Sequence, residues 1–511
     1  SGRPGPCWLD IPLNVQGAFV ETEDLEGFDP EDYENGGTGW GTMGNIHAIP
    51  EDEAGKGEKR QLLPGKVSRE TADLILSKIR AAKRPVINAG NGIRIAGAHD
   101  VFMRVAEKLG IPVITGWDSE DCICDEHPLY TGRAGNMGDR AGNFAIQNSD
   151  LVLSVGSRLS IRQVGYNYKT WARAAFVIAN DIDSEELKKP SVHADLAVHA
   201  DAKDLLEQLD GALDEILEKE GNQLAESLSK KGEKQLFGGG EGLPGMSWSE
   251  TCRMWKETYP VVQEKHWNFT DQEPANVYAA IQAISSRLKE DQITVVGNGS
   301  ACVVGGHAYV IKKGQRFITN SAVAAMGYDL PAAIGAWTAS RDSRCYSQGR
   351  DRSGEDLILV TGDGSIQMNL QELQTIIHHK MGIKIFLINN GGYHSIRQTQ
   401  KNFFGEPLIG IGVDSGDLSF PDMEKLAGAY GYPYIKAEHN SELAKAVEQT
   451  LAVEGPVICE IFVSMDQNFE PKSSAKRLPD GTLVSPPLED LAPFLPEEEM
   501  DRNMIIPRIR E

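Results

Sequence analysis

Two apolar stretches between residues 357 and 388 each end in a group of glycine and polar residues, and this repeated arrangement constrains the fold more than any other feature. Residues 357–360 precede Gly362-Asp363-Gly364-Ser365, and residues 383–388 precede Asn389-Asn390-Gly391-Gly392. Between them, apolar residues recur mostly at spacings of three and four, which is typical of a helix. The order predicts a βαβ unit, whose parallel strands present their carboxyl ends at one edge of a sheet, where ligands bind.

The residues at these two strand ends suit a metal ion and a phosphate. Asp363 and Asn390 offer the hard oxygen ligands that Mg²⁺ and Ca²⁺ prefer. The glycines allow the backbone to approach a diphosphate closely, and the helix that begins after Gly364 favours an anion at its N-terminus. Gly-Asp-Gly alone is equally typical of a simple turn. Its pairing with Asn389-Asn390 after the next strand favours a binding site instead.

Composition limits the functions that the chain can have. A length of 511 residues is enough for roughly three domains, and the net charge of -23 argues against nonspecific binding of nucleic acid. No apolar stretch is long enough to span a membrane, and no signal peptide is evident. The seven cysteines are scattered and odd in number, which favours isolated reduced thiols. We therefore expect a cytoplasmic protein that binds neither nucleic acid nor membranes.

Strand and helix patterns alternate through residue 209, which predicts a parallel α/β domain. Its first helix covers residues 68–80, with Ser68 as N-cap and Ala72, Leu74, Ile75 and Ile79 facing the core. Residues 214–248 are charged and then glycine-rich, and we expect an extended connection there. A second α/β region starts near residue 274, and its strand at 293–296 ends in Gly297-Asn298-Gly299-Ser300.

The spacing of Asp363 and Asn390 resembles the signature of thiamine diphosphate (ThDP) enzymes. Residues 85–463, and again 1–16 (SGRPGPCWLDIPLNVQ), resemble the large catalytic subunit of acetolactate synthase. The resemblance implies two doubly wound parallel-sheet α/β domains, preceded by a remnant strand of a third domain. The implied boundaries are 1–20 for the remnant of a pyrimidine-binding (PYR) domain, 21–63 for an acidic linker, 64–212 for a central domain, 213–270 for a connector, 271–465 for a diphosphate-binding (PP) domain and 466–511 for a tail.

The same resemblance implies roles for individual residues. Asp363 and Asn390 would bind Mg²⁺ through their side chains and Gly392 through its carbonyl. Met368 would be the apolar wedge that bends ThDP, a positional contribution to catalysis, although a methionine at this point of a helix is more often a core residue. The residues expected to contact the cofactor are Gly297, Asn298, Gly299, Ser300, Ala324, Met326, Gly362, Asp363, Gly364, Ser365, Asn390, Gly391, Gly392 and Tyr393.

Several further side chains are candidates for chemistry. Arg162 would face the active site and hold a substrate carboxylate, a task that suits a forked guanidinium. Arg158, Arg3 and the turn at residues 90–92 lie where relatives contact FAD, so FAD is a candidate cofactor; a salt bridge or a plain glycine turn is the alternative. His394 could exchange protons near the cofactor, or be structural. Thr399 stands where the synthases carry a tryptophan that favours 2-oxobutyrate as acceptor.

The resemblance implies a transferase of branched-chain amino acid synthesis, which decarboxylates pyruvate and ligates the remaining unit to an acceptor carbonyl. Such enzymes are homodimers or homotetramers, with ThDP between the PYR domain of one subunit and the PP domain of another. A glutamate of the PYR domain starts the chemistry, and the sequence holds no counterpart to it, so we expect a PYR domain upstream or in trans. The alternatives are a ThDP-dependent C–C lyase, hydrolase or decarboxylase, and a non-catalytic module that only binds the cofactor.

Overall fold

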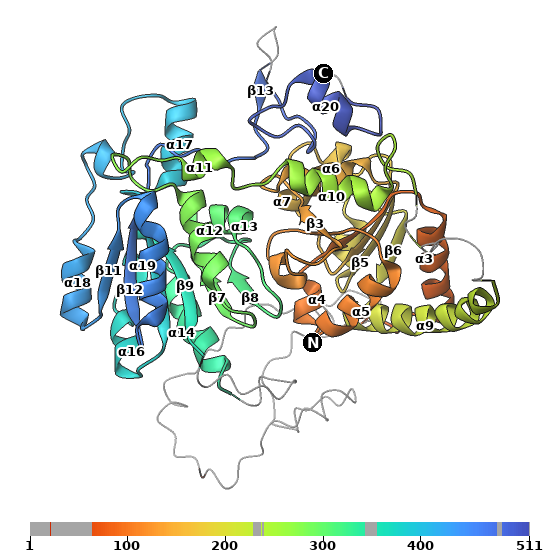
Figure 1. The fold of residues 1–511 in the computed structure, drawn as a ribbon, viewed down its shortest axis with the longest axis horizontal. Helices are drawn as coiled ribbons and strands as arrows, with labels where there is room; N and C mark the ends of the chain where they lie inside the picture. Colours follow the sequence, from red (N-terminus) through yellow and green to blue (C-terminus); the bar gives the residue numbers. More distant parts are fainter. Residues whose placement is uncertain are drawn as a thin grey trace, which may run out of the picture. The chain divides into compact units, whose positions relative to one another are not determined.

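We describe the protein from a computed structural model that covers Glu21 and residues 64–227, 237, 240–342, 355–477 and 483–509. The remnant strand, nearly all of the acidic linker and Arg3 lie outside these residues. Gly65–Glu511 forms one compact unit, and Figure 1 shows its two sheets, the first drawn in orange to yellow and the second in green to blue. Across the described residues, no helix is long and apolar enough to cross a membrane.

The first sheet has six parallel strands in the order β3-β2-β1-β4-β5-β6. The order reverses between β1 and β4, which is the topological switch point of a doubly wound sheet. Both of these strands are buried along their whole length, as expected for a sheet covered on both faces. The strands are β1 Pro85–Ala89, β2 Val113–Thr115, β3 Tyr130–Arg133, β4 Leu151–Val155, β5 Phe176–Asp181 and β6 Leu196–His199.

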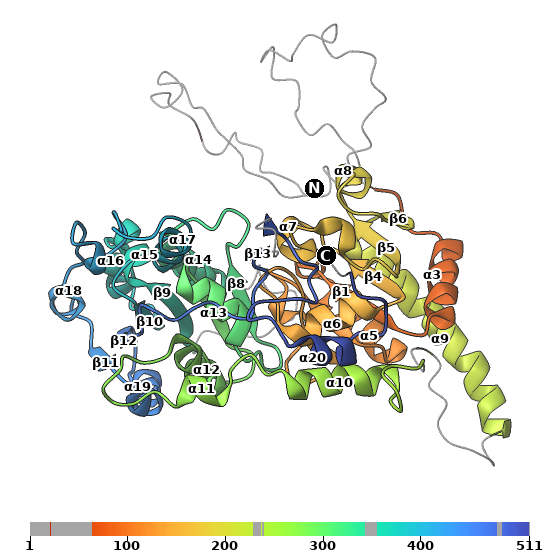
Figure 2. The ribbon, with the colours of Figure 1, turned by 90° about the horizontal axis from the view of Figure 1, so that it is seen from above.

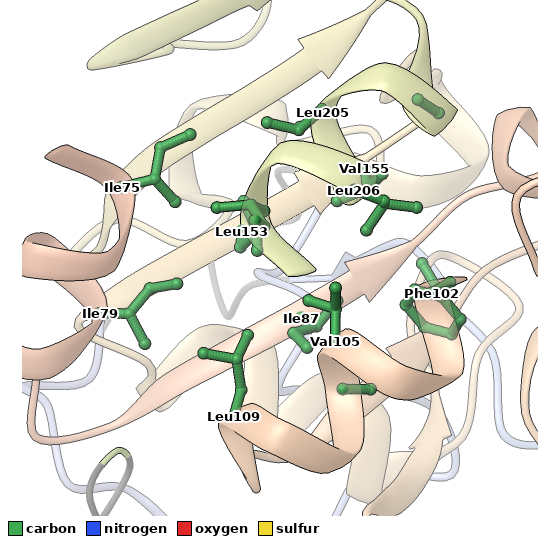
Figure 3. Close-up of a cluster of buried hydrophobic side chains, with 14 of the residues drawn as sticks. Ile75, Ile79, Ile87, Phe102, Val105, Leu109, Leu153, Val155, Leu205 and Leu206 are labelled. Carbon is green, nitrogen blue, oxygen red and sulfur yellow. The ribbon is translucent and has the colours of Figure 1, made fainter. Parts of the chain in front are cut away.

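Three helices cover one face of this sheet: α3 Arg69–Ala81, α5 His99–Leu109 and α9 Ala202–Ser227. Figure 3 shows their side chains, such as Ile75 and Phe102, packed against Ile87 and Leu153 of the strands. The other face packs against α6 Arg140–Asn148 and α10 Trp248–Thr258.

Two expectations for this part of the chain are wrong in detail. Ser68 does cap α3, since its Oγ accepts a hydrogen bond from Thr71 N, but Leu74 is 44% exposed and Leu76 takes the core position instead. The extended connection predicted from residue 214 is helical as far as Ser227, as a continuation of α9, whose buried residues include Leu213.

The second sheet also has six parallel strands, in the order β11-β12-β10-β9-β7-β8. The strands are β7 Ile293–Val296, β8 Arg316–Thr319, β9 Leu357–Gly362, β10 Ile383–Asn389, β11 Tyr434–Ala437 and β12 Val457–Phe462. One face packs against α12 Val277–Arg287, α13 Ser300–Ala308 and α19 Asn440–Ala452. The other packs against α14 Asp329–Ala339, α16 Glu372–His378 and α18 Met423–Tyr430. Two doubly wound parallel sheets are therefore confirmed.

Shorter elements complete the described chain. They are α4 Gly92–Ile95, η2 Glu120–Cys122, α7 Ile161–Val164, η3 Tyr168–Thr170, α8 Ser184–Lys188, α11 Glu264–Trp267, α15 Asp363–Ile366, η5 Gln367–Asn369, α17 His394–Phe403, η6 Val413–Ser415, β13 Lys476–Arg477, β14 Leu483–Val484 and α20 Glu497–Asn503. Figure 2 shows α20 beside α10, and Trp255 Nε1 donates a hydrogen bond to Asn503 Oδ1 at 2.8 Å. The tail thus packs on the helices of the first sheet. The five cysteines described are free thiols, as predicted.

Candidate functional site

Asp363 lies at the carboxyl end of β9 and is 3% exposed. Its Oδ1 accepts a hydrogen bond from Gly364 N at 2.9 Å, and its Oδ2 accepts one from Gly392 N at 2.9 Å. Burial raises the pKa of Asp363 to about 7. A cation beside the carboxylate would favour its charged form, so the site suits a bound metal ion.

Asn390 follows β10 and connects the loop before α13 to the same strand ends. Its Nδ2 donates a hydrogen bond to Ser300 Oγ at 2.9 Å, at the start of α13. Its Oδ1 is buried and has no hydrogen-bond partner. A buried acceptor without a partner costs free energy unless a ligand satisfies it, so this oxygen is fitted to receive a cation. The predicted meeting of Asp363, Asn390 and Gly392 is therefore present in the structure.

The loop after β10 is held in place by Arg397, which is fully buried. Its guanidinium forms a double hydrogen bond with Asp414, both at 2.8 Å, and donates to Asn390 O and Gly391 O at 3.1 Å. Gly391 has a φ of 66°, and a Cβ at Gly412 would lie 2.1 Å from Gly391 O. The backbone around the predicted metal site is thus fixed by an ion pair and by close glycine contacts.

The loop at residues 320–327 lies against α15 and η5, the short helices that begin at Asp363. Gly327 N donates to Ser365 Oγ at 3.0 Å, and Asn369 Nδ2 donates to Gly327 O at 2.6 Å. A Cβ added at Gly327 would lie 2.5 Å from Met368 Cβ. Met368 is 48% exposed, so it is not a core methionine. Helix α14 starts at Asp329, so Ala324 and Met326 lie in the loop before it.

The remaining predicted cofactor contacts differ in the space around them and in their exposure to solvent. Gly299 has a φ of 88° and open space where a side chain would be, whereas a Cβ at Gly297 would lie 2.5 Å from Asp329 Oδ2. Gly364 is covered by the ring of Tyr393. Met326 is 38% exposed, and Ala324 has a φ of 55°. Asn298 and Gly362 are half-buried and Ser300 and Ser365 are buried, all beside the same strand ends.

Arg162 lies in α7, the short helix that follows β4 of the first sheet. Its Cζ lies 4.8 Å from the centre of the Trp117 ring. Trp117 and Asp118 follow β2, and Asp118 Oδ2 accepts a hydrogen bond from Ser321 Oγ at 2.7 Å. Arg162 therefore lies close to the 320–327 loop. Sequence reasoning missed Trp117, Asp118 and Ser321, although a carboxylate just after a buried strand was the signal that had identified Asp363.

His394 has a different environment from the one expected. It is 4% exposed, and its Nε2 lies 2.7 Å from Gln467 O and 2.9 Å from Gln398 Nε2, with Phe469 against the ring. Burial lowers the pKa of His394 to about 4, so the ring is neutral at pH 7. Thr399 is exposed and its Oγ1 donates to Ser395 O.

The turn at residues 90–92 is closed against the end of β4. A Cβ at Gly90 would lie 2.3 Å from Gly156 O, and one at Gly92 would lie 2.7 Å from Gly156 Cα. Arg158 pairs with Glu186 at 3.4 Å. The glycines of this turn thus permit close backbone packing, and Arg158 forms a partly exposed ion pair.

Comparison with known proteins finds two matching family models. Residues 72–209 match the central domain of thiamine pyrophosphate enzymes, and residues 297–461 match their C-terminal TPP binding domain. The chain is 27% identical to a probable acetolactate synthase large subunit of Methanococcus aeolicus, over 95% of this chain and 70% of the relative. It is 27% identical to that of Methanocaldococcus jannaschii, over 91% and 67%. It is 25% identical to the isozyme 1 large subunit of Escherichia coli, over 92% and 69%.

Proposed function

Because the chain belongs to the thiamine pyrophosphate enzymes, we propose that it binds ThDP and Mg²⁺ and acts as a carboligase of the acetolactate synthase type. It would decarboxylate pyruvate and ligate the remaining two-carbon unit to an acceptor carbonyl. The partnerless, buried Asn390 Oδ1 beside Asp363 is the observation that carries the proposal. When bound, ThDP supplies the group that stabilises the carbanion, and the protein supplies binding and orientation.

Each residue around the strand ends then has a physical role. Asp363, Asn390 and the Gly392 carbonyl would hold Mg²⁺, a cation that neutralises the charge of a diphosphate. The backbone of Gly364 and Gly391 and the glycine turn before α13 approach the phosphate oxygens. Met368 and the 324–326 backbone orient the pyrimidine and thiazolium rings, supported by the bond between Gly327 and Ser365.

The roles predicted for Arg162 and His394 differ in how well the structure supports them. Arg162 is retained as the group that holds the carboxylate of the 2-oxo acid, since its stacking on Trp117 fixes the guanidinium. His394 is assigned a structural role, because its ring is buried, neutral and bonded to the tail. We leave FAD out of the proposal, since the described residues that suggested it, the turn at residues 90–92 and Arg158, make contacts within the chain.

We further propose that the site is completed by a PYR domain in a homo-oligomer. Large apolar side chains are exposed on both sides of it: Val323 (79%) and Met368 on one side, and Val413 (51%) on the other. Exposed apolar groups gathered in this way usually mark an interface. The glutamate that starts ThDP chemistry in the family would come from that domain.

Isothermal titration of the chain with ThDP and Mg²⁺, alone and with a PYR domain supplied in trans, tests the proposal. Cofactor binding that requires the metal is expected, followed by decarboxylation of pyruvate and ligation of the two-carbon unit to an acceptor carbonyl once the PYR domain is present. Absence of binding in both titrations would refute the assignment. Binding with no turnover of pyruvate would favour a lyase or a cofactor-binding module.

A further inference from the structure

The segment after β2 places a tryptophan and an aspartate beside the proposed active site. Asp118 has a φ of 66°, a left-handed conformation that costs free energy for a residue other than glycine. Such conformations persist where the surroundings hold them, and they gather at functional sites. Here Asp118 is held by Ser321, which is 2% exposed and donates from its Oγ at 2.7 Å and from its N at 3.4 Å.

The position of Ser321 connects Asp118 to the cofactor-facing loop. Ser321 lies near the start of the loop that carries Ala324 and Met326. The loop ends at Gly327, whose N donates a hydrogen bond to Ser365 Oγ and whose Cα lies against Met368. Asp118 also acts electrostatically on Tyr328 at the end of the loop. The carboxylate therefore lies beside the loop that we propose faces the cofactor.

Two charged side chains of the described chain, opposite in sign, lie beside the 320–327 loop. Arg162 stacks on Trp117 and interacts electrostatically with Asp118 and with Cys302 of α13. Glu120 is 2% exposed, and burial raises its pKa to about 8, so it is mostly neutral at pH 7. Arg162 can bind the carboxylate of one 2-oxo acid, whereas the carboxylate of Asp118 would repel that of an anionic acceptor.

Asp118 also keeps hydrogen-bonding capacity for a ligand. An ionised carboxylate has about four acceptor positions, and Ser321 uses two of them, one at the long distance of 3.4 Å. A hydroxyl group is the neutral donor that best matches such an acceptor. A site built to bind a hydroxyl discriminates strongly against molecules that lack one.

On the basis of the proposed carboligase function, we propose that Asp118 determines acceptor specificity: it repels a second 2-oxo acid and accepts a hydrogen bond from a hydroxyl of the acceptor. The acceptor is then a hydroxyaldehyde or hydroxyketone. In the reaction, the bond between the acyl carbon and the carboxylate of the donor breaks and CO₂ leaves. A new C–C bond forms between that acyl carbon and the acceptor carbonyl carbon, and the acceptor oxygen takes up one proton.

The test compares two acceptors with pyruvate as donor, using the full chain with ThDP, Mg²⁺ and the PYR domain. The acceptors are glycolaldehyde and 2-oxobutyrate. The unmodified protein is expected to have the higher kcat/KM for glycolaldehyde. Asp118→Asn, which removes the repulsive charge, should shift the ratio of kcat/KM values toward 2-oxobutyrate by about 10-fold or more. Asp118→Glu should keep most of the original ratio.

Asp271→Asn is a matched control, since exposed Asp271 also accepts a hydroxyl bond, from Ser441 Oγ at 2.6 Å. It should leave the ratio unchanged. If turnover is too slow to measure, calorimetric titration with each acceptor gives the ratio of Kd values, which should shift in the same direction. An equal effect of Asp118→Asn on both acceptors would overturn the inference while leaving the carboligase intact. Loss of cofactor binding in the unmodified protein would instead refute the proposed function.

Discussion

At the scale of single residues, the site depends on polar atoms whose partners lie outside the chain. Asn390 has one side-chain atom that is satisfied by Ser300 and one that is not. A folded protein rarely buries an acceptor in this way without using it. The free oxygen is therefore better explained by a ligand than by stability.

Replacing Asn390 should separate binding from folding. We expect Asn390→Ala to weaken Mg²⁺-dependent binding of ThDP by at least about 10-fold, as for the loss of other groups at metal sites. Titration calorimetry measures this effect. Asn180→Ala is the control, because Asn180 in the first sheet also has a buried Oδ1 without a partner. Weakening of ThDP binding by the same factor in both variants would contradict a metal role for Asn390.

A second change tests the contact beneath Met368. Gly327 has a φ of 80°, and an added Cβ would meet Met368, whereas Gly431 has a φ of 82° with open space around it. Both alanine variants bear the backbone cost of about 1–2 kcal/mol. Gly327→Ala should lose about 1–3 kcal/mol more through overpacking and should also bind ThDP more weakly. Urea unfolding and calorimetry measure the two effects, and equal losses in both variants would disprove the contact.

How much of the site was predictable depends on the kind of contact involved. Asp363 and Asn390 were predictable because an apolar strand, a glycine turn and a polar group follow each other in the sequence. The contact of Asp118 with Ser321 was not, since it joins residues far apart in the chain. His394 follows the same strand end as Asn390, yet its ring is taken up by Gln467, which sequence spacing cannot reveal.

At the scale of elements, periodicity predicted most strands and helices, but it did not predict which of their residues are buried or where α9 ends. Leu74 fits the apolar pattern of α3 and still faces solvent, whereas Leu76 is buried against the neighbouring elements. The charged residues after Asp214 resembled a linker, but they continue α9, which is packed against the first sheet at its earlier residues. Burial against neighbouring elements overrides local composition in such cases.

The tail is attached to α11 and α12 by a charged cluster around Glu470. Its Oε1 accepts hydrogen bonds from Lys265 Nζ at 2.5 Å and from His266 Nε2 at 3.5 Å. The ring of His266 stacks on Tyr278 at 4.8 Å, and Tyr278 Oη accepts from Glu470 N at 2.7 Å. The bond with His266 lowers the pKa of Glu470 to about 2.

This pKa gives a pH-dependent contribution to stability with a defined sign. Because the folded pKa of about 2 lies below the ordinary value of 4.5, the contribution is complete above pH 4.5 and is lost as the pH falls toward 2. Glu470→Gln should therefore be less stable than the unmodified protein at pH 6, and the difference should shrink between pH 4.5 and 2. Urea unfolding across this range measures it. Glu438→Gln, at an exposed pair with Lys436, should show little difference at any pH.

At the scale of the whole molecule, the two sheets are joined by a buried carboxylate, Asp121. Asp121 accepts from Arg94 Nε at 3.2 Å on the first-sheet side, and from Arg316 Nε at 2.8 Å and Phe317 N at 2.9 Å on the second-sheet side. Asp121 is 4% exposed. Removing one member of such a buried cluster leaves charges without compensation.

We expect Asp121→Ala to lower the free energy of unfolding by about 3–5 kcal/mol and to separate the unfolding of the two sheets into two calorimetric transitions. Asp210→Ala is the control, because Asp210 pairs with Arg104 and Lys108 within the first-sheet region. It should lower stability without separating the transitions. One unchanged transition in Asp121→Ala would show that other contacts couple the sheets.

Helix α13 is constrained at both ends by different parts of the chain. Its first residue, Ser300, meets Asn390, and the carbonyls of its last turn accept hydrogen bonds from Arg133 of the first sheet, at 3.2 Å for Gly306 and 2.8 Å for His307. A substitution near Arg133 can therefore alter cofactor affinity without touching the cofactor. Mutant libraries selected for tighter binding should yield changes on both sheets, so adaptation of this enzyme can proceed through residues that no inventory of cofactor contacts would include.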